Sequence, residues 1–269
     1  MPHPSLPSLF SLQGKTAIVT GGCQNFGLEI ATGLAEMGAN VVVTSRQQEK
    51  AQSTAAEMAE AHGVKTLGVA LDVTDEGSVI AAYDAAFQVF PRIDILVNNA
   101  GGHGSNPTGD LVNESLACFD RYLSANITCT FLMMREFARR WPGGEGASII
   151  NIASVCAVVG RDRSVYEGTD MTPSPIGYAA GKAGVVGLTQ DGAALLAPKG
   201  IRVNAVSPGG FERGQAPAFV DAYSSHTMLK RMGRDGLDLK GAVAFLASDA
   251  AAYITAHNLL LDGGFTRYS

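Results

Sequence analysis

The sequence predicts a single α/β domain folded around one doubly wound parallel sheet, with helices on both faces. Two observations support this fold class. Short apolar segments rich in β-branched residues recur along all 269 residues, and longer stretches with helical spacing separate them. The expected strands lie at 16–20, 40–45, 66–71, 94–98, 148–154, 201–207 and 258–262. The expected helices lie at 27–38, 47–62, 75–90, 115–140, 178–197 and 237–248.

The expected strands are justified by their length and composition. In chain order they read TAIVT, NVVVTS, TLGVAL, DILVN, SIINIAS, IRVNAVS and NLLLD, and each is short enough to be one strand. Nearly continuous apolar runs suit parallel strands that are buried on both faces. The intervening stretches have the length and spacing of helices. This alternation predicts a Rossmann-like fold of about seven strands.

The domain organisation is simple. No linker, low-complexity tract or internal repeat divides residues 1–269, so we expect one domain. Residues 1–13 precede the first strand as an N-terminal extension. The polar, proline-containing stretch 160–177 is interpreted as an inserted loop at the mouth of an active site.

Composition excludes several classes of function. The net charge of −5 and the absence of a Lys/Arg run argue against a nucleic-acid partner. The four cysteines have no metal-ligand spacing, so no metal is expected and the thiols are interpreted as reduced and structural. The N-terminus lacks the features of a signal peptide, and no apolar run could span a membrane. We therefore expect a cytoplasmic protein without a membrane partner.

A glycine-rich turn, Thr20 to Gly27, follows the first expected strand and opens a helix. Glycines let the backbone approach a pyrophosphate, and the helix N-terminus stabilises its charge. The turn predicts dinucleotide contacts from Gly21, Asn25, Phe26 and Gly27, although a plain turn is the alternative. Asn25 stands where a glycine is usual, but asparagine tolerates a left-handed backbone.

The end of the second expected strand bears on the choice of nicotinamide cofactor. An acidic residue there suits NAD, whereas a cation suits the extra phosphate of NADP. This chain has Ser45 and Arg46, with no carboxylate beside them in the sequence. NADP(H) is therefore favoured, and NAD(H) remains possible. An exposed arginine at a helix start is the structural alternative for Arg46.

Tyr178 and Lys182 are four residues apart, so on a helix both project from one face. A nearby ammonium stabilises a phenolate, which makes Tyr178 a candidate for general acid/base work. Ser154 ends a strand at the sheet edge where doubly wound folds bind ligands. Asn126 lies in a long helical stretch, where asparagine is a mediocre helix former.

Taken together, these residues resemble the short-chain dehydrogenase/reductase family from Gly14 to Gly264. Beyond the glycine-rich turn, the family pattern matches Asp72 and Val73, the Asn-Asn-Ala-Gly motif, the Pro-Gly turn and the C-terminal Asp-Gly-Gly. The resemblance extends the expected cofactor-binding set to Asp72, Val73, Asn99, Ala100, Gly101, Tyr178, Lys182, Pro208, Gly209 and Phe211.

The resemblance implies a reaction and an assembly. Asn126, Ser154, Tyr178 and Lys182 fall on the family's catalytic positions. The implied reaction is hydride transfer between a secondary alcohol or ketone carbon and the nicotinamide, coupled to proton transfer through Tyr178. Lys182 would lower the pKa of Tyr178 and bind the nicotinamide ribose, while Asn126 would hold a relay water. Family members also imply a homotetramer or homodimer.

Two departures from the family pattern stand out. After Pro208 and Gly209 the family often has a threonine that contacts the nicotinamide amide, but this chain reads Gly-Phe-Glu-Arg at 210–213. The interval from Ser154 to Tyr178 is also longer than the family norm. Tyr166 stands nearer the usual distance, but it lacks a lysine four residues on.

The substrate is expected to meet Ser154, Tyr178 and the inserted loop, where Arg161 and Arg163 are candidate anion clamps. A polar sugar, sugar acid or polyol is the favoured class, and the long insert resembles members acting on sugars, sugar acids and nonulosonate-type precursors. These charges could equally serve only to solvate a loop. The sequence also leaves open a 3-oxoacyl-carrier-protein reductase, a steroid or apolar ketone reductase, and a non-catalytic nicotinamide-binding sensor.

Overall fold

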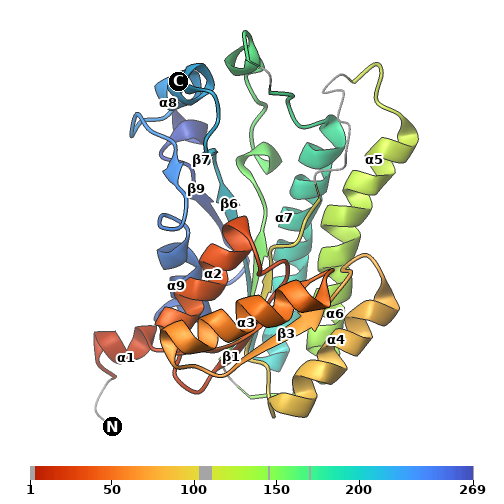
Figure 1. Ribbon diagram of the computed structural model, residues 1–269, viewed down its shortest axis with the longest axis vertical. Coiled ribbons are helices and arrows are strands. Elements are labelled where there is room, and N and C mark those ends of the chain that lie inside the picture. The colour runs from red at the N-terminus through yellow and green to blue at the C-terminus, as the bar shows by residue number, and fades with distance from the viewer. Residues whose placement is uncertain (1–3, 103–110, 145, 170, 269) are drawn as a thin grey trace.

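The computed structural model describes residues 4–102, 111–144, 146–169 and 171–268 (Figure 1). Within them the fold is the expected single α/β domain, with a seven-stranded sheet in the order β3-β2-β1-β4-β5-β6-β9 and parallel pairing throughout. The strands of this sheet are β1 (Thr16–Val19), β2 (Asn40–Ser45), β3 (Thr66–Ala70), β4 (Ile95–Asn98), β5 (Ala147–Ile152), β6 (Ile201–Pro208) and β9 (Asn258–Leu261). All seven expected strand segments are confirmed.

The expected helices are also present, but one is interrupted and another begins earlier than expected. The helices are α2 (Asn25–Glu36), α3 (Gln48–His62), α4 (Glu76–Val89), α5 (Leu116–Leu123), α6 (Cys129–Arg140), α7 (Ile176–Leu196) and α9 (Lys240–Ala247). The stretch 115–140 is interrupted by a π-helical turn at Ser124–Thr128. Helix α7 begins at Ile176, so the last two residues of the expected loop 160–177 already belong to it.

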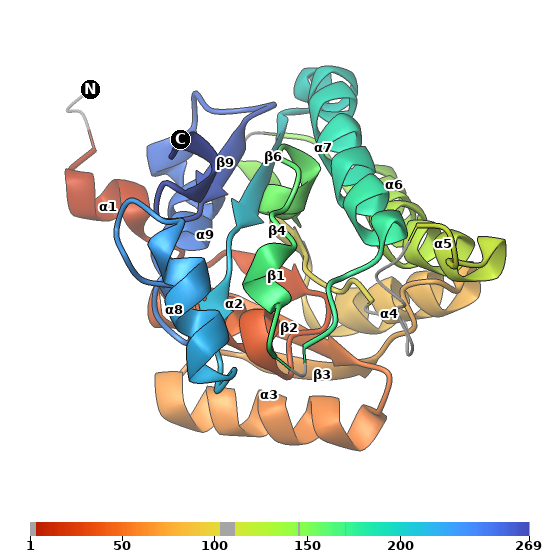
Figure 2. The same cartoon turned by 90° about the horizontal axis from the view of Figure 1, so that it is seen from above.

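Two apolar layers hold the helices against the sheet. One joins α2, α3 and α9 to the sheet through residues such as Ile30 and Val243. The other joins α4, α6 and α7 to the opposite face through residues such as Phe137 and Ala193. Figure 2 shows α6 and α7 on the other side of the sheet from α9. All positions of β1 and β4 are buried, as expected for central parallel strands.

The N-terminal residues pack against the domain. Helix α1 (Leu6–Phe10) precedes Leu12, which is fully buried and donates its N–H to the carbonyl oxygen of Met37 at 2.9 Å. The Phe10 ring lies 6.1 Å from that of Phe245. The first strand therefore starts from an anchored position.

The strand order creates a crevice where a ligand can bind. Strand β1 pairs with β2 on one side and with β4 on the other, so the chain reverses its direction of winding between them. Ligands of such sheets bind outside the carboxyl ends of the strands at this point. In Figure 1 the inserted loop and α8 (Pro217–Ser225) project from that same end of the molecule. A short parallel pair, β7 (Phe211–Glu212) and β8 (Gly233–Arg234), lies between β6 and α9 in the chain.

Candidate active site

The turn between β1 and α2 has the geometry of a phosphate-binding turn. Gly21 has a φ of 62° and Asn25 has a φ of 47°, so Asn25 adopts a left-handed backbone, which asparagine tolerates better than most residues. A Cβ on Gly27 would lie 2.0 Å from the carbonyl oxygen of Gly21, so the turn requires glycine there. Gln24, at the start of α2, makes no side-chain capping bond. The first N–H groups of α2 are therefore available to an anion.

The hydroxyl of Thr20 joins this turn to the end of β4. It accepts hydrogen bonds from the backbone N–H groups of Asn99 at 3.0 Å and Ala100 at 2.9 Å. The Asn99 amide in turn donates to the carbonyl oxygens of Thr20 at 2.9 Å and Gly21 at 3.4 Å. The structure therefore brings Asn99, Ala100 and the adjoining Gly101 beside the glycine-rich turn.

The ends of β2 and β3 lie side by side. Ser45 is half-buried, whereas Arg46 and Asp72 are exposed, and Val73 follows as a half-buried residue. Hydrogen bonds from Thr74 are the main cause that lowers the pKa of the Asp72 carboxyl, and the Arg46 guanidinium lowers it further. No carboxylate neighbours Arg46 in the sequence, but the fold brings Asp72 into its electrostatic range.

Ser154, Tyr178 and Lys182 meet beyond the end of β5. Ser154 follows β5 and is buried, while Tyr178 and Lys182 are one turn apart near the start of α7. The side chains of Ser154 and Tyr178 form a hydrogen bond. The Lys182 ammonium donates to the carbonyl oxygen of Ile152 at 2.7 Å and lies 5.9 Å from the centroid of the Tyr178 ring.

Burial dominates the protonation of this pair. It raises the pKa of Tyr178 to about 12, against the opposing effects of the Ser154 hydrogen bond and the Arg161 charge. It lowers the pKa of Lys182 to about 8. The Ser154 hydrogen bond and the Arg161 charge favour the Tyr178 phenolate. That Lys182 lowers the pKa of Tyr178 stays a prediction, and the Lys182 ammonium is directed at the Ile152 carbonyl.

Asn126 is placed by the π-helical turn Ser124–Thr128, a feature that often marks functional positions in helices. Its side chain is buried and donates to the carbonyl oxygen of Tyr122 at 2.8 Å. Its Oδ1 has no hydrogen-bond partner among the described residues. A Cβ on Gly101 would lie 2.9 Å from that oxygen and 3.2 Å from the Lys182 ammonium. Glycine therefore leaves a gap that both polar groups face.

Pro208 and Gly209 end β6 at the same edge of the sheet. Beyond them the backbone N–H of Gly210 donates to the hydroxyl of Tyr223 in α8 at 2.6 Å. A Cβ on Gly210 would lie 2.7 Å from the Tyr223 ring, so glycine is needed for this close contact. Tyr223 therefore positions the turn that follows β6.

Phe211 and Arg213 contact the glycine-rich turn directly. The Phe211 ring packs edge-on against Phe26, with ring centroids 4.7 Å apart. The Arg213 guanidinium lies 3.9 Å from the centroid of the Phe26 ring and donates to Asp235 at 2.6 Å. The segment after β6 is thus fixed to Phe26 on one side and to Asp235 on the other.

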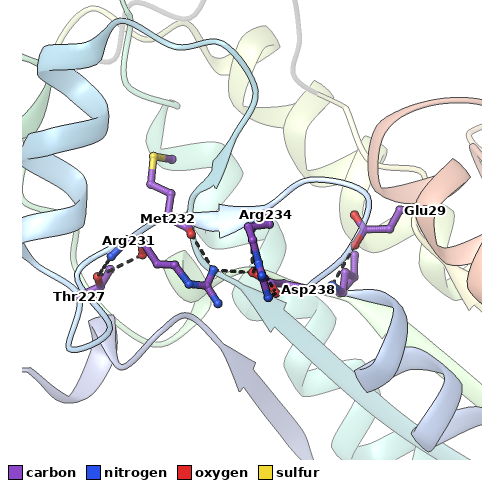
Figure 3. A network of polar contacts seen from close by, with 7 residues as sticks. Glu29, Thr227, Arg231, Met232, Arg234 and Asp238 are labelled. Atoms are coloured by element: carbon purple, nitrogen blue, oxygen red, sulfur yellow. Dashed lines mark hydrogen bonds and ion pairs between the residues drawn. The ribbon is translucent and has the colours of Figure 1, made fainter.

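A polar network holds the next part of this segment against α2 (Figure 3). The Asp238 carboxylate accepts from Arg231 at 2.5 Å and from Arg234 at 2.7 Å, and these two arginines lower its pKa. The buried Glu29 carboxylate accepts from the backbone N–H of Leu239 at 2.9 Å. Glu29 lies two residues beyond Gly27, so the network supports the helix behind the glycine-rich turn.

Comparison with known proteins decides the family. A family model described as enoyl-(acyl carrier protein) reductase matches residues 22–266. D-threitol dehydrogenase of Mycolicibacterium smegmatis is 36% identical over 263 residues, which cover 96% of this chain and 95% of that protein. The chain belongs to the short-chain dehydrogenase/reductase family. It is accordingly an NAD(P)-dependent oxidoreductase that acts on alcohol or ketone groups.

Other family members show the range of relatives. A 3-oxoacyl-[acyl-carrier-protein] reductase of Aquifex aeolicus is 33% identical over 94% of this chain and 98% of its own length. The solved structure of a gluconate 5-dehydrogenase from Burkholderia cenocepacia, in complex with NADP and tartrate, is 32% identical. It covers 97% of this chain and 99% of its own, with a TM-score of 0.86. The fold is thus shared with relatives whose named substrates differ.

The loop before α7, interpreted from the sequence as an insertion, packs on α8 and the segment after it. Its buried Val165 forms an apolar cluster with Phe219 and Met232, from α8 and the segment after it. The Tyr166 ring lies 5.2 Å from that of Phe219, so Tyr166 serves this packing. Arg161 is half-buried and Arg163 is exposed, and both line an open hollow beside α7.

Several residues of the site carry no signal in the sequence that marks their role. Thr20 and Tyr223 act through contacts with distant backbone, and Glu29 and Arg213 act through segments that meet only in the fold. The buried amide pair Asn98 and Asn151, joined at 2.8 Å, likewise needs both strands in register. A polar residue within an apolar strand is the cue that could have marked this pair.

Membrane spans and metal clusters are both absent from the described residues. No helix there is both long enough and apolar enough to cross a bilayer. No cluster of three or more histidine, cysteine, aspartate or glutamate side chains with metal-binding geometry occurs in that part of the chain either.

Proposed function

We propose that this protein is an NADP(H)-dependent dehydrogenase/reductase that interconverts a secondary alcohol and a ketone on a sugar, sugar acid or polyol. The observation that carries the proposal is the hydrogen-bonded pair of Ser154 and Tyr178 at the carboxyl end of β5, with Lys182 one turn further along α7. The pair offers two hydroxyls to one substrate oxygen, in a crevice whose opposite wall is a phosphate-binding turn.

Tyr178 is the proposed acid/base. In reduction it donates its proton to the carbonyl oxygen, and in oxidation it accepts the proton of the hydroxyl. Ser154 orients that oxygen, since its own hydroxyl already bonds to Tyr178. The bound nicotinamide supplies or accepts the hydride. A pKa of about 12 keeps Tyr178 protonated at neutral pH, as a proton donor must be.

Lys182 and Asn126 are proposed to connect Tyr178 to solvent. Both face the gap beside Gly101, and the Oδ1 of Asn126 is a buried acceptor with no described partner. A water in this gap would accept from the Lys182 ammonium and donate to Asn126. Lys182 would also bind the nicotinamide ribose. Protons could then pass between Tyr178 and bulk water without opening the site.

The proposed cofactor residues form the other wall of the crevice. The fit rests on the turn itself: Gly27 leaves no room for a Cβ, and the start of α2 carries uncapped N–H groups. Ser45 and Arg46 would take the 2′-phosphate of NADP, because Arg46 is exposed at the end of β2. The other proposed contacts are Gly21, Asn25, Phe26, Asp72, Val73, Asn99, Ala100, Gly101, Tyr178, Lys182, Pro208, Gly209 and Phe211.

The substrate class is supported by the polar inserted loop, which carries Arg161 and Arg163 at the mouth of the site. Relatives named for D-threitol and gluconate support it further. A 3-oxoacyl-carrier-protein reductase is the second candidate, favoured by the relative from Aquifex aeolicus. An acyl carrier protein is acidic, and this chain has a net charge of −5, so the electrostatics favour the small polar substrate.

A cytoplasmic homodimer or homotetramer is proposed as the working form. Helices α5, α6 and α7 expose large apolar side chains at Leu116, Phe131 and Leu195. Such side chains are typical of surfaces that pack against another subunit. Light scattering on the purified chain tests the proposal, which predicts a mass of two or four subunits.

The experiment that tests the function follows nicotinamide absorbance with NADP⁺ and NAD⁺ across alditols, aldonates, aldoses, 3-hydroxyacyl thioesters and hydroxysteroids. The proposal predicts oxidation of at least one polyol or aldonate, with a higher kcat/KM for NADP⁺. Activity confined to hydroxyacyl thioesters would favour the second candidate. Activity confined to hydroxysteroids would overturn the polar-substrate proposal.

A further inference from the structure

We propose that Arg161 is an anion-binding residue that holds the carboxylate of a sugar-acid substrate beside Tyr178. The inference rests on the proposed function and sharpens it, because it selects hydroxy acids among the polar substrates. It also separates Arg161 from Arg163, which the sequence alone treats as equivalent.

The location of Arg161 is defined by the hollow at the mouth of the site. Residues 156–160 form one wall, Ile176 and Ala179 from the first turns of α7 form another, and Arg161 and Arg163 complete the lining. Ala179 directly follows the proposed acid/base. A ligand in this hollow therefore lies next to the helical turn that carries Tyr178.

Arg161 is held in place but keeps most of its hydrogen-bonding capacity. One terminal nitrogen donates to the carbonyl oxygen of Ser174 at 2.6 Å, which ties together the two ends of the inserted loop. A guanidinium has five N–H donors, so this bond leaves a face that can bind a carboxylate. No acidic side chain among the described residues forms an ion pair with Arg161.

Asp162, the acidic residue that follows Arg161 in the chain, makes its contacts with other groups. Asp162 lies 3.3 Å from the imidazole of His226 in an ion-pair geometry and accepts a hydrogen bond from the backbone of Ser164 at 2.8 Å. These contacts direct it toward α8 and the loop's own backbone. Asp162 therefore does not neutralise Arg161, and a half-buried cation without a carboxylate partner is suited to an anionic ligand.

The charge of Arg161 acts on the hydroxyl of Tyr178, the proposed acid/base. It favours the phenolate of Tyr178 and so opposes the effect of burial on the pKa of that hydroxyl. Arg163, although it lines the same hollow, is exposed, where water screens its charge. This electrostatic contact and the position of Ala179 in the lining support a ligand whose carboxylate meets Arg161 and whose hydroxyl meets Tyr178.

The inserted loop has the support that such a role needs. Val165 is buried against Phe219 and Met232, and Tyr166 packs on the same cluster. Because the loop is packed on α8 a few residues beyond Arg161, the cation is presented from an ordered surface.

The test compares two substrates of one carbon skeleton, D-gluconate and D-glucitol, which differ at C1 as carboxylate and CH₂OH. We measure kcat/KM for each with NADP⁺ in the wild type and in Arg161→Gln, which can still donate to Ser174. The ratio of kcat/KM for gluconate to that for glucitol should fall about 10- to 100-fold, as expected for loss of a charge-assisted hydrogen bond. Arg163→Gln, the matched control, should change this ratio less than about threefold.

The possible outcomes separate the two claims. An unchanged ratio in Arg161→Gln, or an equal fall in both variants, overturns the role of Arg161 even if polyols are oxidised. An equal loss for both substrates in Arg161→Gln shows a structural role only and also overturns it. If neither compound is oxidised, the polyol proposal fails for these substrates. Calorimetric titration of D-gluconate into the NADP⁺ complex then tests the carboxylate subsite at Arg161. Weaker binding in Arg161→Gln alone supports the subsite, whereas equal binding or no binding overturns it.

Discussion

The two walls of the crevice are built in different ways. The proposed cofactor wall, made by the glycine-rich turn and the end of β4, is joined by backbone geometry and short polar bonds, such as those from Asn99 and Ala100 to Thr20. The proposed substrate wall, made by the inserted loop and α8, is assembled by side chains from distant segments, as when Val165 of the loop packs on Phe219 of α8. A motif can specify the first kind of wall, because a few adjacent residues determine it. The second kind can vary while the chemistry beneath it stays the same.

The largest expected effect comes from adding a single methyl group to the glycine-rich turn, which should weaken cofactor binding. In Gly27→Ala the added Cβ would stand 2.0 Å from the carbonyl oxygen of Gly21, so the turn must deform. We expect the dissociation constant for NADPH, measured by fluorescence titration, to rise about 100-fold or more. Gly187→Ala is the control, because a Cβ there meets nothing within 4 Å. An unchanged constant in Gly27→Ala would show that the turn does not bind the pyrophosphate.

The burial of Lys182 predicts a pH-dependent stability. Its pKa falls from 10.5 to about 8 in the folded protein. Below pH 8 the buried ammonium is charged and costs stability. Between pH 8 and 10.5 only the unfolded state retains the proton, so the free energy of unfolding rises with pH across this window.

 The destabilising effect of the buried Lys182 ammonium is therefore complete at neutral pH and is lost as the pH rises toward 10.5. Lys182→Met should be more stable than the wild type at pH 7 by about 2 kcal/mol, after the lost bond to Ile152 is deducted.

Urea unfolding at pH 7 and pH 10 measures this difference. The advantage of Lys182→Met should shrink to near zero at pH 10, where the wild-type lysine is neutral in the folded state. Exposed Lys65→Met is the control for loss of a lysine, and its effect should be small and equal at the two pH values. A constant advantage of Lys182→Met across this range would mean that the buried charge is not its source.

A smaller effect, on the preference between NADPH and NADH, is expected from substitutions of the exposed Arg46. Arg46→Asp removes the proposed partner of the 2′-phosphate and places a second carboxylate near Asp72. The ratio of kcat/KM for NADPH to that for NADH should fall about tenfold or more, because repulsion is added to a lost ion pair. Arg46→Gln, which adds no negative charge, should shift the ratio less. If the ratio stays constant in Arg46→Asp, Arg46 has no part in cofactor choice.

The contrast between the walls explains what could be predicted from the sequence. The seven strands were predictable because each is a short apolar run, and the left-handed Asn25 was predictable because asparagine tolerates that conformation. The π-helical turn at Asn126 was not, because 115–140 reads as one continuous helix. The contacts of Arg213 with Phe26 and of Tyr223 with Gly210 depend on tertiary approach, which local pattern does not encode.

The Tyr178 and Lys182 pair likewise combines a feature that the sequence predicts with one that only the fold determines. Spacing alone predicts that both lie on one face of a helix, and the structure has them one turn apart on α7. It does not predict that burial raises the pKa of Tyr178 to about 12, or that Lys182 is directed at Ile152. Desolvation depends on the whole packed site, so only the fold determines it.

The proposed role of Tyr178 as the acid/base of the reaction is tested by Tyr178→Phe. The variant keeps the ring that packs against Tyr122 and loses only the hydroxyl. On the best substrate of the panel, kcat should fall about 100- to 10,000-fold. The dissociation constant for NADPH should stay within about threefold of the wild-type value, since the cofactor wall is untouched. A kcat within about threefold of the wild type, with the same NADPH affinity, would show that Tyr178 is not the acid/base.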